Sequence, residues 1–180
     1  MNEKEVRIVN IVVSSDLEHD VPLEKMAATL SNTEYNPEQF PGLVLRIKEP
    51  KTTALIFSSG KIVVTGARSL KKVREAINKI KEALKKINIK IIIEPKINIQ
   101  NMVASGDIGM RLNLNKLAMK LNNTEYEPEQ FPGLVYKLSK AKATFLLFSN
   151  GKIVCTGTKS EKAVEEAVEL LKINLKRATA

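Results

Sequence analysis

Apolar and polar residues alternate in the first part of the chain. Between residues 6 and 14, one side carries Val9, Ile11 and Val13, and the other carries Ile8, Asn10 and Val12. A period of two predicts a β-strand that is buried on one face. The same alternation occurs in residues 43–47, 53–57 and 61–66, which are therefore predicted to be three further strands.

Two segments instead have the spacing of amphipathic helices. After Asp20-Val21-Pro22, where proline is expected in the first turn, apolar residues recur at Leu23, Met26, Ala27 and Leu30. Ser69 precedes a longer series, formed by Val73, Ile77, Ile80, Leu84 and Ile87. Loops are expected at Asn36-Pro37 and Pro41-Gly42 on either side of Phe40, and a hairpin turn at Ser58-Ser59-Gly60.

This order of elements occurs twice. NTEYNPEQFPGLV (Asn32 to Val44) recurs as NTEYEPEQFPGLV (Asn123 to Val135), and FSSGKIVVTG (Phe57 to Gly66) recurs as FSNGKIVCTG (Phe148 to Gly157). Both pairs are offset by 91 residues, and 38 of the 74 positions aligned without a gap are identical, which indicates a duplication. Because this period is too long for a solenoid, we predict two α/β repeats, at residues 1–91 and 92–180.

The predicted fold class is α+β. Antiparallel strands with helices on one face, present in two copies, favour a continuous sheet of two α/β repeats with pseudo-twofold symmetry. The other face would be open. Alternation assigns to this open face Thr53, Leu55, Phe57, Lys61, Val63 and Thr65, their twins Thr144, Leu146, Phe148, Lys152, Val154 and Thr156, and Asn10, Val12, Asn101 and Val103.

An apolar face of this extent, flanked by cations, is typical of a binding surface. The alternative is a second core, covered by a segment that the periodicity does not reveal. The net charge of +9, from 29 Lys and Arg against 20 Asp and Glu, favours a polyanion as the ligand. The same lysine-rich composition is also typical of the surface charge of thermophile proteins.

The chemistry of the open face suits one groove in particular. At A·T pairs the minor groove presents only the acceptors adenine N3 and thymine O2, which amide and hydroxyl donors can meet. At G·C pairs the guanine 2-amino group would collide with valine and leucine side chains. We therefore expect a preference for A·T pairs that arises by exclusion.

The residues do not indicate an enzyme. We find no pairing of nucleophile and base, and the Gly60-Lys61 segment lacks the spacing of a phosphate-binding loop. With one cysteine, Cys155, and one histidine, His19, the chain cannot form an internal disulfide or a Cys/His zinc site, and no cofactor is expected. The apolar runs are too short to span a membrane and no apolar leader is present, so we expect a cytoplasmic protein.

Two binding functions compete with a duplex-DNA function. One is a single-stranded nucleic-acid binder without sequence specificity, in which the phenylalanines act as stacking platforms. The other is a protein scaffold whose apolar face mediates homodimerisation. The second is compatible with DNA binding, since a homodimer can hide the face when DNA is absent.

Three duplicated motifs carry a resemblance to a known family. They are QFPGL, LIFSSGKIVVTG with its twin, and the Asn-x-Val of the first strand of each repeat. The chain resembles the TATA-box-binding proteins of archaeal and eukaryotic transcription over essentially its whole length. The resemblance implies a pseudo-twofold saddle, a continuous curved antiparallel sheet with helices on its convex face. It also implies an archaeal-type general initiation factor that binds TATA-box DNA in the minor groove, and that is nucleoid-associated, or nuclear in a eukaryote. A kink of about 80° is documented for the family and comes with the resemblance.

The resemblance also implies residue roles. The wedges inserted between base pairs are Phe40, Phe57, Phe131 and Phe148, whereas Phe145 is expected in the core. Base contacts come from Asn10, Thr65, Asn101 and Thr156, and an apolar floor from Val12, Leu55, Val63, Val103, Leu146 and Val154. Phosphate contacts fall to Arg46, Lys61, Lys137 and Lys152.

Partners follow from the same resemblance. Transcription factor B is expected to bind the second repeat through Glu127 and Glu129, and to bring RNA polymerase to the promoter. Glu38 matches Glu129, so an acidic residue alone does not select the repeat. The closing helices differ in charge, with the first rich in lysine and the second carrying Glu161, Glu165, Glu166 and Glu169. Because the wedges are the same in both repeats, we expect little intrinsic preference for one orientation on the DNA.

Overall fold

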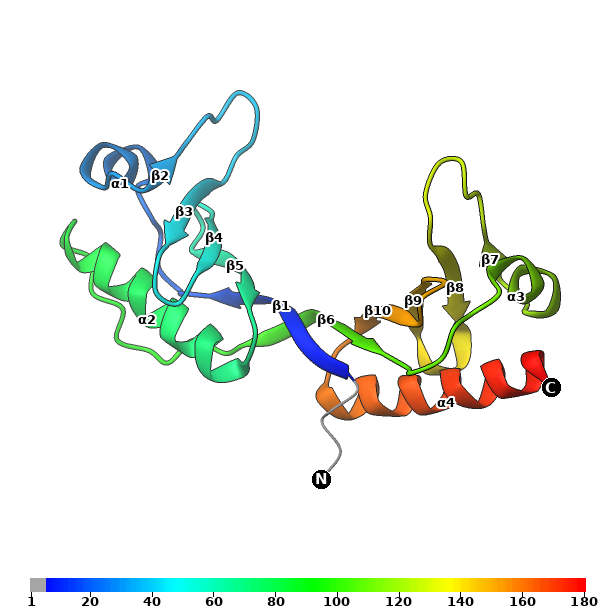
Figure 1. Cartoon of the computed structure of the whole chain (residues 1–180). Helices are drawn as coiled ribbons and strands as arrows, with labels where there is room; N and C mark the ends of the chain where they lie inside the picture. Colours follow the sequence, from blue (N-terminus) through cyan, green and yellow to red (C-terminus); the bar gives the residue numbers. More distant parts are fainter. Residues whose placement is uncertain (1–5) are drawn as a thin grey trace. The chain divides into compact units, whose positions relative to one another are not determined.

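The computed structural model describes residues 6–180, which form ten strands and four α-helices (Figure 1). The first series is β1 (Val6–Asp16), α1 (Leu23–Thr29), β2 (Thr33–Glu34), β3 (Leu43–Ile47), β4 (Thr52–Ile56), β5 (Lys61–Ala67) and α2 (Leu70–Lys85). The second is β6 (Asn98–Asp107), α3 (Leu114–Lys120), β7 (Thr124–Glu125), β8 (Leu134–Leu138), a 3₁₀ turn (Ser139–Ala141), β9 (Ala143–Leu147), β10 (Lys152–Thr158) and α4 (Glu161–Thr179).

The strands form one open antiparallel sheet. Their order is β2-β3-β4-β5-β1-β6-β10-β9-β8-β7, so the second half repeats the order of the first in reverse. This confirms the α+β class and the two repeats. The short strands β2 and β7 were not predicted, because two residues are too few for alternation to appear.

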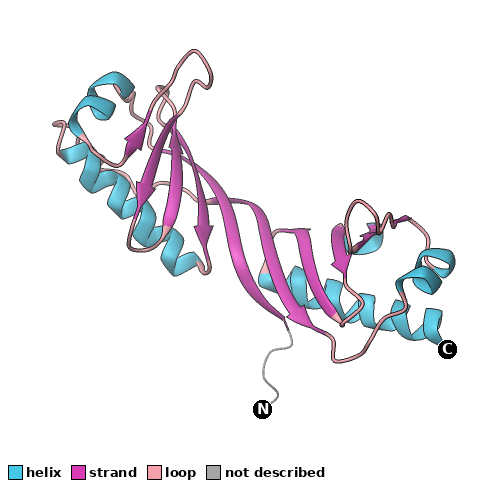
Figure 2. Ribbon diagram, turned by 45° about the horizontal axis from the view of Figure 1, so that its top comes forward, coloured by secondary structure: helices cyan, strands magenta, loops and turns pink. Residues whose placement is uncertain are grey.

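Contacts divide the chain into two compact units. The N-terminal unit is Asn10–Gln100, and the C-terminal unit is Asn101–Ala180 together with the described residues before Asn10. In each unit the helices lie on one face of the strands (Figure 2). As the spacing predicted, α2 buries Val73, Ile77, Ile80 and Leu84, and α4 buries Val164, Val168, Leu171 and Leu175.

Serine hydroxyls begin both long helices. Ser69 Oγ accepts a hydrogen bond from the backbone N–H of Lys72 at 3.2 Å, and Ser160 Oγ accepts one from Ala163 at 3.0 Å. Each bond satisfies a backbone donor that has no partner within its helix. Helix α1 begins at Leu23, so Pro22 is its N-cap and not, as predicted, a residue of its first turn.

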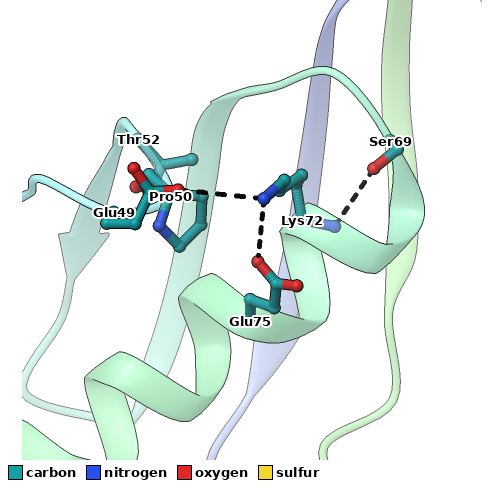
Figure 3. A network of polar contacts seen from close by, with 6 residues as sticks. All are labelled: Glu49, Pro50, Thr52, Ser69, Lys72 and Glu75. Carbon is teal, nitrogen blue, oxygen red and sulfur yellow. Dashed lines mark hydrogen bonds and ion pairs between the residues drawn. The ribbon is translucent and has the colours of Figure 1, made fainter.

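Lys72 also ties α2 to the sheet of the N-terminal unit. Its ammonium lies 3.3 Å from Glu75 one turn along the helix and 3.8 Å from Glu49 in the β3–β4 connection (Figure 3). The basic series on α2 is therefore partly neutralised at its first turn. Among the helices of residues 6–180, none is both long and apolar enough to cross a membrane.

Candidate nucleic-acid interface

The strands of both units have one buried face and one that stays accessible. In β4 and β5, Ala54, Ile56, Ile62 and Val64 are fully buried beneath the helices. The side chains that alternate with them are half-buried or exposed, as predicted: Thr53, Leu55, Lys61, Val63 and Thr65. The C-terminal unit repeats this pattern with Thr144, Leu146, Lys152, Val154 and Thr156. We call these accessible side chains, with those of β1, β3, β6 and β8 on the same side, the open face.

Each unit has an apolar floor on the open face of its own strands. Leu55 stands opposite Val63 on one side and opposite Val44 on the other, and all three are half-buried. Leu146 has the same neighbours in the C-terminal unit, Val154 and Val135. Val44 and Val135 were absent from the predicted site, although alternation from the buried Leu43 already assigns Val44 to this face. No segment among residues 6–180 buries the floor, which argues against a second core.

A β-bulge fixes the side chain of Asn10. The register between β1 and β5 shifts between Ile11 and Val13, and Gly66 has a positive φ of 99° at this shift. The Gly66 N–H donates to Oδ1 of Asn10 at 2.7 Å, and Nδ2 of Asn10 donates to Oγ1 of Thr65 at 3.2 Å. Because a backbone N–H requires an acceptor, these two bonds determine which end of the carboxamide is oxygen.

The second repeat contains the same bulge. Gly157 has a φ of 93° and donates to Oδ1 of Asn101 at 2.8 Å, while Nδ2 of Asn101 donates to Oγ1 of Thr156 at 3.0 Å. The Thr65 hydroxyl lies 3.4 Å from Oδ1 of Asn10, which is long for an O–H donor, so its proton can turn to a ligand. Each carboxamide keeps a second N–H. The open face therefore offers donors, held in one orientation, to a ligand that presents acceptors.

Two phenylalanine pairs stand beside the floor. The ring centroids of Phe40 and Phe57 are 5.8 Å apart at 70°, and those of Phe131 and Phe148 are 6.0 Å apart at 73°, both edge to face. Phe40 is 41% exposed and Phe131 is 42% exposed, an unusual state for this side chain. Phe145 is fully buried, which confirms its predicted place in the core.

Glycine allows each ring pair to approach the backbone. A Cβ at Gly42 would lie 2.7 Å from Cε1 of Phe40 and 3.0 Å from Cε1 of Phe57. A Cβ at Gly133 would lie 2.8 Å and 3.0 Å from the matching atoms of Phe131 and Phe148. Real Cβ atoms are essentially never this close, so the Pro-Gly of the motif positions the rings as well as marking a loop.

The cations proposed for phosphate contact are all exposed. Arg46 forms an ion pair with Glu34 at 3.0 Å, whereas none of the ion pairs within residues 6–180 includes Lys61, Lys137 or Lys152. Beside the open face of the N-terminal unit, a cavity of about 710 Å³ is lined by Phe57, Lys61 and Val63, and also by Lys96. Lys96 lies before the first residue of β6, so the alternation of apolar and polar residues along the strands does not reveal it.

Glu127 and Glu129 are exposed in the loop between β7 and β8. The carbonyl of Glu127 accepts from the N–H groups of Gln130 and Phe131, and the carbonyl of Asn36 accepts from Gln39 and Phe40 in the same way. The two loops therefore have the same turn. They differ at this one position, where the first repeat has an amide and the second a carboxylate.

Neither the open face nor the core resembles a reactive centre. Burial raises the pKa of the Cys155 thiol to about 11, so little thiolate is present at neutral pH. Within the described chain, no group of three His, Cys, Asp or Glu side chains is placed to hold a metal ion. The arrangement is suited to binding: an apolar floor, fixed donors, exposed rings and flanking cations.

This combination defines a binding protein, and comparison with known proteins identifies its family. The family described as transcription factor TFIID (or TATA-binding protein, TBP) matches residues 5–87 and again residues 96–178. The TATA-box-binding protein of Thermococcus kodakarensis is 53% identical over 171 residues, covering 95% of this chain and 90% of that protein. The one from Archaeoglobus fulgidus is 46% identical over 178 residues, covering 98% and 97%.

A solved structure supports the same conclusion. Methanococcus jannaschii TBP superposes with a TM-score of 0.90 and 48% identity, covering 96% of this chain and 99% of that chain. The chain belongs to the TATA-box-binding protein family. It is therefore a transcription initiation factor and not an enzyme.

Proposed function

We propose that this protein binds the minor groove of TATA-box DNA through the open faces of its two repeats, residues 1–91 and 92–180, and kinks the duplex. The observation that carries the proposal is the paired arrangement of Asn10 with Thr65 and of Asn101 with Thr156. The second amide N–H of each asparagine and the hydroxyl of each threonine are free to donate, and the minor groove at A·T pairs presents only acceptors. The apolar floor around Leu55 and Leu146 has no partner for the 2-amino group of guanine, so G·C pairs are excluded.

Each phenylalanine pair acts as a wedge. Phe40 and Phe57 enter one base step, and Phe131 and Phe148 enter the other. An inserted ring replaces part of the stacking that it disrupts, and the unstacking costs a few kcal/mol for each step. Because one ring of each pair is exposed, the other is half-buried and the pairs are already formed, little rearrangement of the protein is needed.

Phosphate contacts by Arg46, Lys61, Lys137 and Lys152 add affinity that depends on salt but not on sequence. Arg46 must then exchange Glu34 for a phosphate, whereas Lys137 has no ion pair to give up within the described residues. This is the one unequal position among the proposed DNA contacts. It is too modest to impose a direction on the complex.

Direction then comes from a partner. We propose that transcription factor B docks on the β7–β8 loop through Glu127 and Glu129 and recruits RNA polymerase. Glu127 distinguishes this loop from its counterpart, where Asn36 has the same backbone turn and no charge. Exchanging the two residues, as Glu127→Asn with Asn36→Glu, should move the docking site to the first repeat.

A bending assay tests the DNA function. A TATA duplex with donor and acceptor dyes at its ends should show increased energy transfer on binding, and the same change with inosine·cytosine pairs, which lack the 2-amino group. Combining Phe57→Ala with Phe148→Ala should abolish the change. Met119→Ala, at an 86% exposed apolar residue outside the open face, is the matched control and should leave the change intact.

The rival functions predict other outcomes. Tighter binding to single-stranded poly-dT than to the TATA duplex would replace the proposal with a stacking-platform function. Sedimentation without DNA tests the homodimer: if the open face mediates it, TATA duplex should dissociate the dimer at the concentration that saturates bending.

A further inference from the structure

The outer side of α4 in the C-terminal unit carries a surface that the DNA function does not use. Leu170, Ile173, Asn174 and Arg177 follow each other at spacings of three, one and three residues, which places them in one stripe along the helix. Ile173 is 45% exposed. Beside the stripe lies a cavity of about 400 Å³, lined by residues of α3, α4 and β8 and of the segment after α3.

Donors and cations line this cavity. Tyr136 is buried, and its hydroxyl oxygen accepts a hydrogen bond from Nδ2 of Asn174 at 2.8 Å. The phenolic proton therefore remains free to donate. Lys120 and Arg177 line the same cavity, and neither has an acidic partner within 4.0 Å among residues 6–180. An acceptor with negative charge, such as a carboxylate, fits this set of groups.

The first repeat provides an internal comparison. At the positions of Leu170 and Ile173 it has Lys79 and Glu82, which form an exposed ion pair at 3.8 Å. The cavity-lining residues are also replaced there: Tyr136 by Leu45, Asn174 by Ala83 and Lys120 by Thr29. The second repeat has therefore gained an apolar stripe, a buried hydroxyl and an additional cation at one place.

A purely structural role does not account for this combination. Cations in the last turn of a helix offset its dipole, and Lys120 and Arg177 occupy such turns. That role requires neither the exposed Ile173 nor the replacement of an ion pair by two apolar residues. The hydrogen bond from Asn174 to Tyr136 joins β8 to α4, but it uses only the hydroxyl oxygen and leaves the phenolic proton without an acceptor among the described residues.

We infer that this surface, formed by Leu170, Ile173, Asn174 and Arg177 of α4 with Lys120 and Tyr136, docks an acidic amphipathic segment of a partner protein. An apolar side chain of that segment packs on Leu170 and Ile173. A carboxylate enters the cavity and meets the Tyr136 hydroxyl, Lys120 and Arg177. The charge of the cavity selects an acidic partner over a basic one, and its place outside the open face lets DNA bind at the same time.

A designed peptide tests the inference. The probe is a fluorescein-labelled peptide of about 15 residues, with Leu and Phe at helical positions i, i+3 and i+7 and Glu on the other side. We expect saturable binding by fluorescence anisotropy, at least about tenfold weaker when Lys replaces every Glu. In heteronuclear NMR spectra, amide shifts should concentrate in residues 118–122, 136 and 170–178.

Matched variants separate the surface from the general positive charge of the protein. Ile173→Glu gives this position the charge of its counterpart in the first repeat, so the fold should tolerate it, and binding should weaken about tenfold. The combination of Lys120→Glu and Arg177→Glu should do the same. Lys86→Glu, at the position that matches Arg177, should change the affinity less than about twofold.

Three results would overturn the inference. The first is the absence of saturable binding by the acidic peptide. The second is equal binding by wild type and by Ile173→Glu, or NMR shifts that concentrate on α2. The third is self-association that sedimentation detects and Ile173→Glu abolishes, because the occupant would then be a second copy of this chain. None of these results depends on the DNA function, which the bending assay tests separately.

Discussion

The two faces of the same strands have diverged very differently between the repeats. On the open face, Asn10, Val12, Leu55, Val63 and Thr65 each have an identical twin, and the only changed pair among the proposed DNA contacts is Arg46 with Lys137. On the covered face most pairs differ, including Ile11 with Met102, Val13 with Ala104, Leu45 with Tyr136, Ala54 with Phe145 and Val64 with Cys155. On these strands the accessible side chains of the open face have stayed alike while the buried ones have changed.

This is the reverse of what folding alone would produce. A core needs only constant volume and apolar character, so its residues can change together. Phe145 is much larger than Ala54, and the smaller Ala104, Val168 and Ala178 stand where the first repeat has Val13, Ile77 and Ile87. Under the proposed function the open face has no such freedom, because each side chain must fit an external ligand. The comparison teaches that the two repeats fold by different packing and bind by the same chemistry.

The largest expected effect is a loss of stability without a loss of DNA affinity, on changing one residue of the covered face. Phe145→Ala should lower the free energy of unfolding by about 3–5 kcal/mol, because the fully buried ring leaves a cavity. Urea unfolding followed by circular dichroism measures this. The molecules that remain folded should bind TATA duplex within about twofold of wild type, since a residue of the covered face contacts no ligand. A loss of affinity with unchanged stability would reverse the assignment of the faces.

A change on the open face should do the opposite. Asn10→Asp with Asn101→Asp retains an acceptor for the N–H groups of Gly66 and Gly157 but removes both amide donors. Each lost hydrogen bond should cost about 1–1.5 kcal/mol of binding free energy, measured by titration with TATA duplex. Asn78→Asp with Asn122→Asp, at two exposed asparagines outside the open face, adds the same two negative charges and is the control. Equal losses in the control and the double variant would show that charge, not the donors, is responsible.

A smaller effect should follow from changing what supports the rings. In Gly42→Ala the new Cβ would displace Phe40 and Phe57 from their edge-to-face arrangement. We expect the affinity for TATA duplex in the bending assay to fall about tenfold. The free energy of unfolding should change by less than about 1 kcal/mol, because residue 42 lies beside the exposed ring of Phe40. Gly109→Ala is the control for a glycine change: its methyl group would have no atom within 4 Å, and its φ of 75° makes it the more strained backbone substitution. Unchanged bending by Gly42→Ala would show that the pair is not needed as a unit.

The smallest expected effect concerns orientation. With a nuclease tethered to one end of the protein, cleavage on the two sides of a TATA element should be equal within about threefold, or about 0.7 kcal/mol. Arg46→Lys removes the unequal pair and should bring the ratio closer to one. A strong single direction without a partner would mean that the differing covered faces influence DNA binding after all.

Much of this architecture could be predicted because its signals are local. Alternation identified the two faces of β4 and β5, and Ser69 was correctly predicted to precede α2, where it is the N-cap. The bulges at Gly66 and Gly157 could not be predicted, since they depend on how two strands distant in the sequence pair. The bonds from these bulges to Asn10 and Asn101 were missed for the same reason. The surface on α4 was missed because its members come from α3, α4 and β8, and no periodicity connects them.

The bulges have a consequence for the thermodynamics of recognition. A carboxamide on a strand normally turns freely about its last torsion, and a ligand must stop that motion when it binds. Asn10 and Asn101 are already held at both ends of the amide, so association removes little side-chain entropy from them. In each repeat a single backbone N–H thereby fixes the orientation of the carboxamide before the proposed contact with DNA forms.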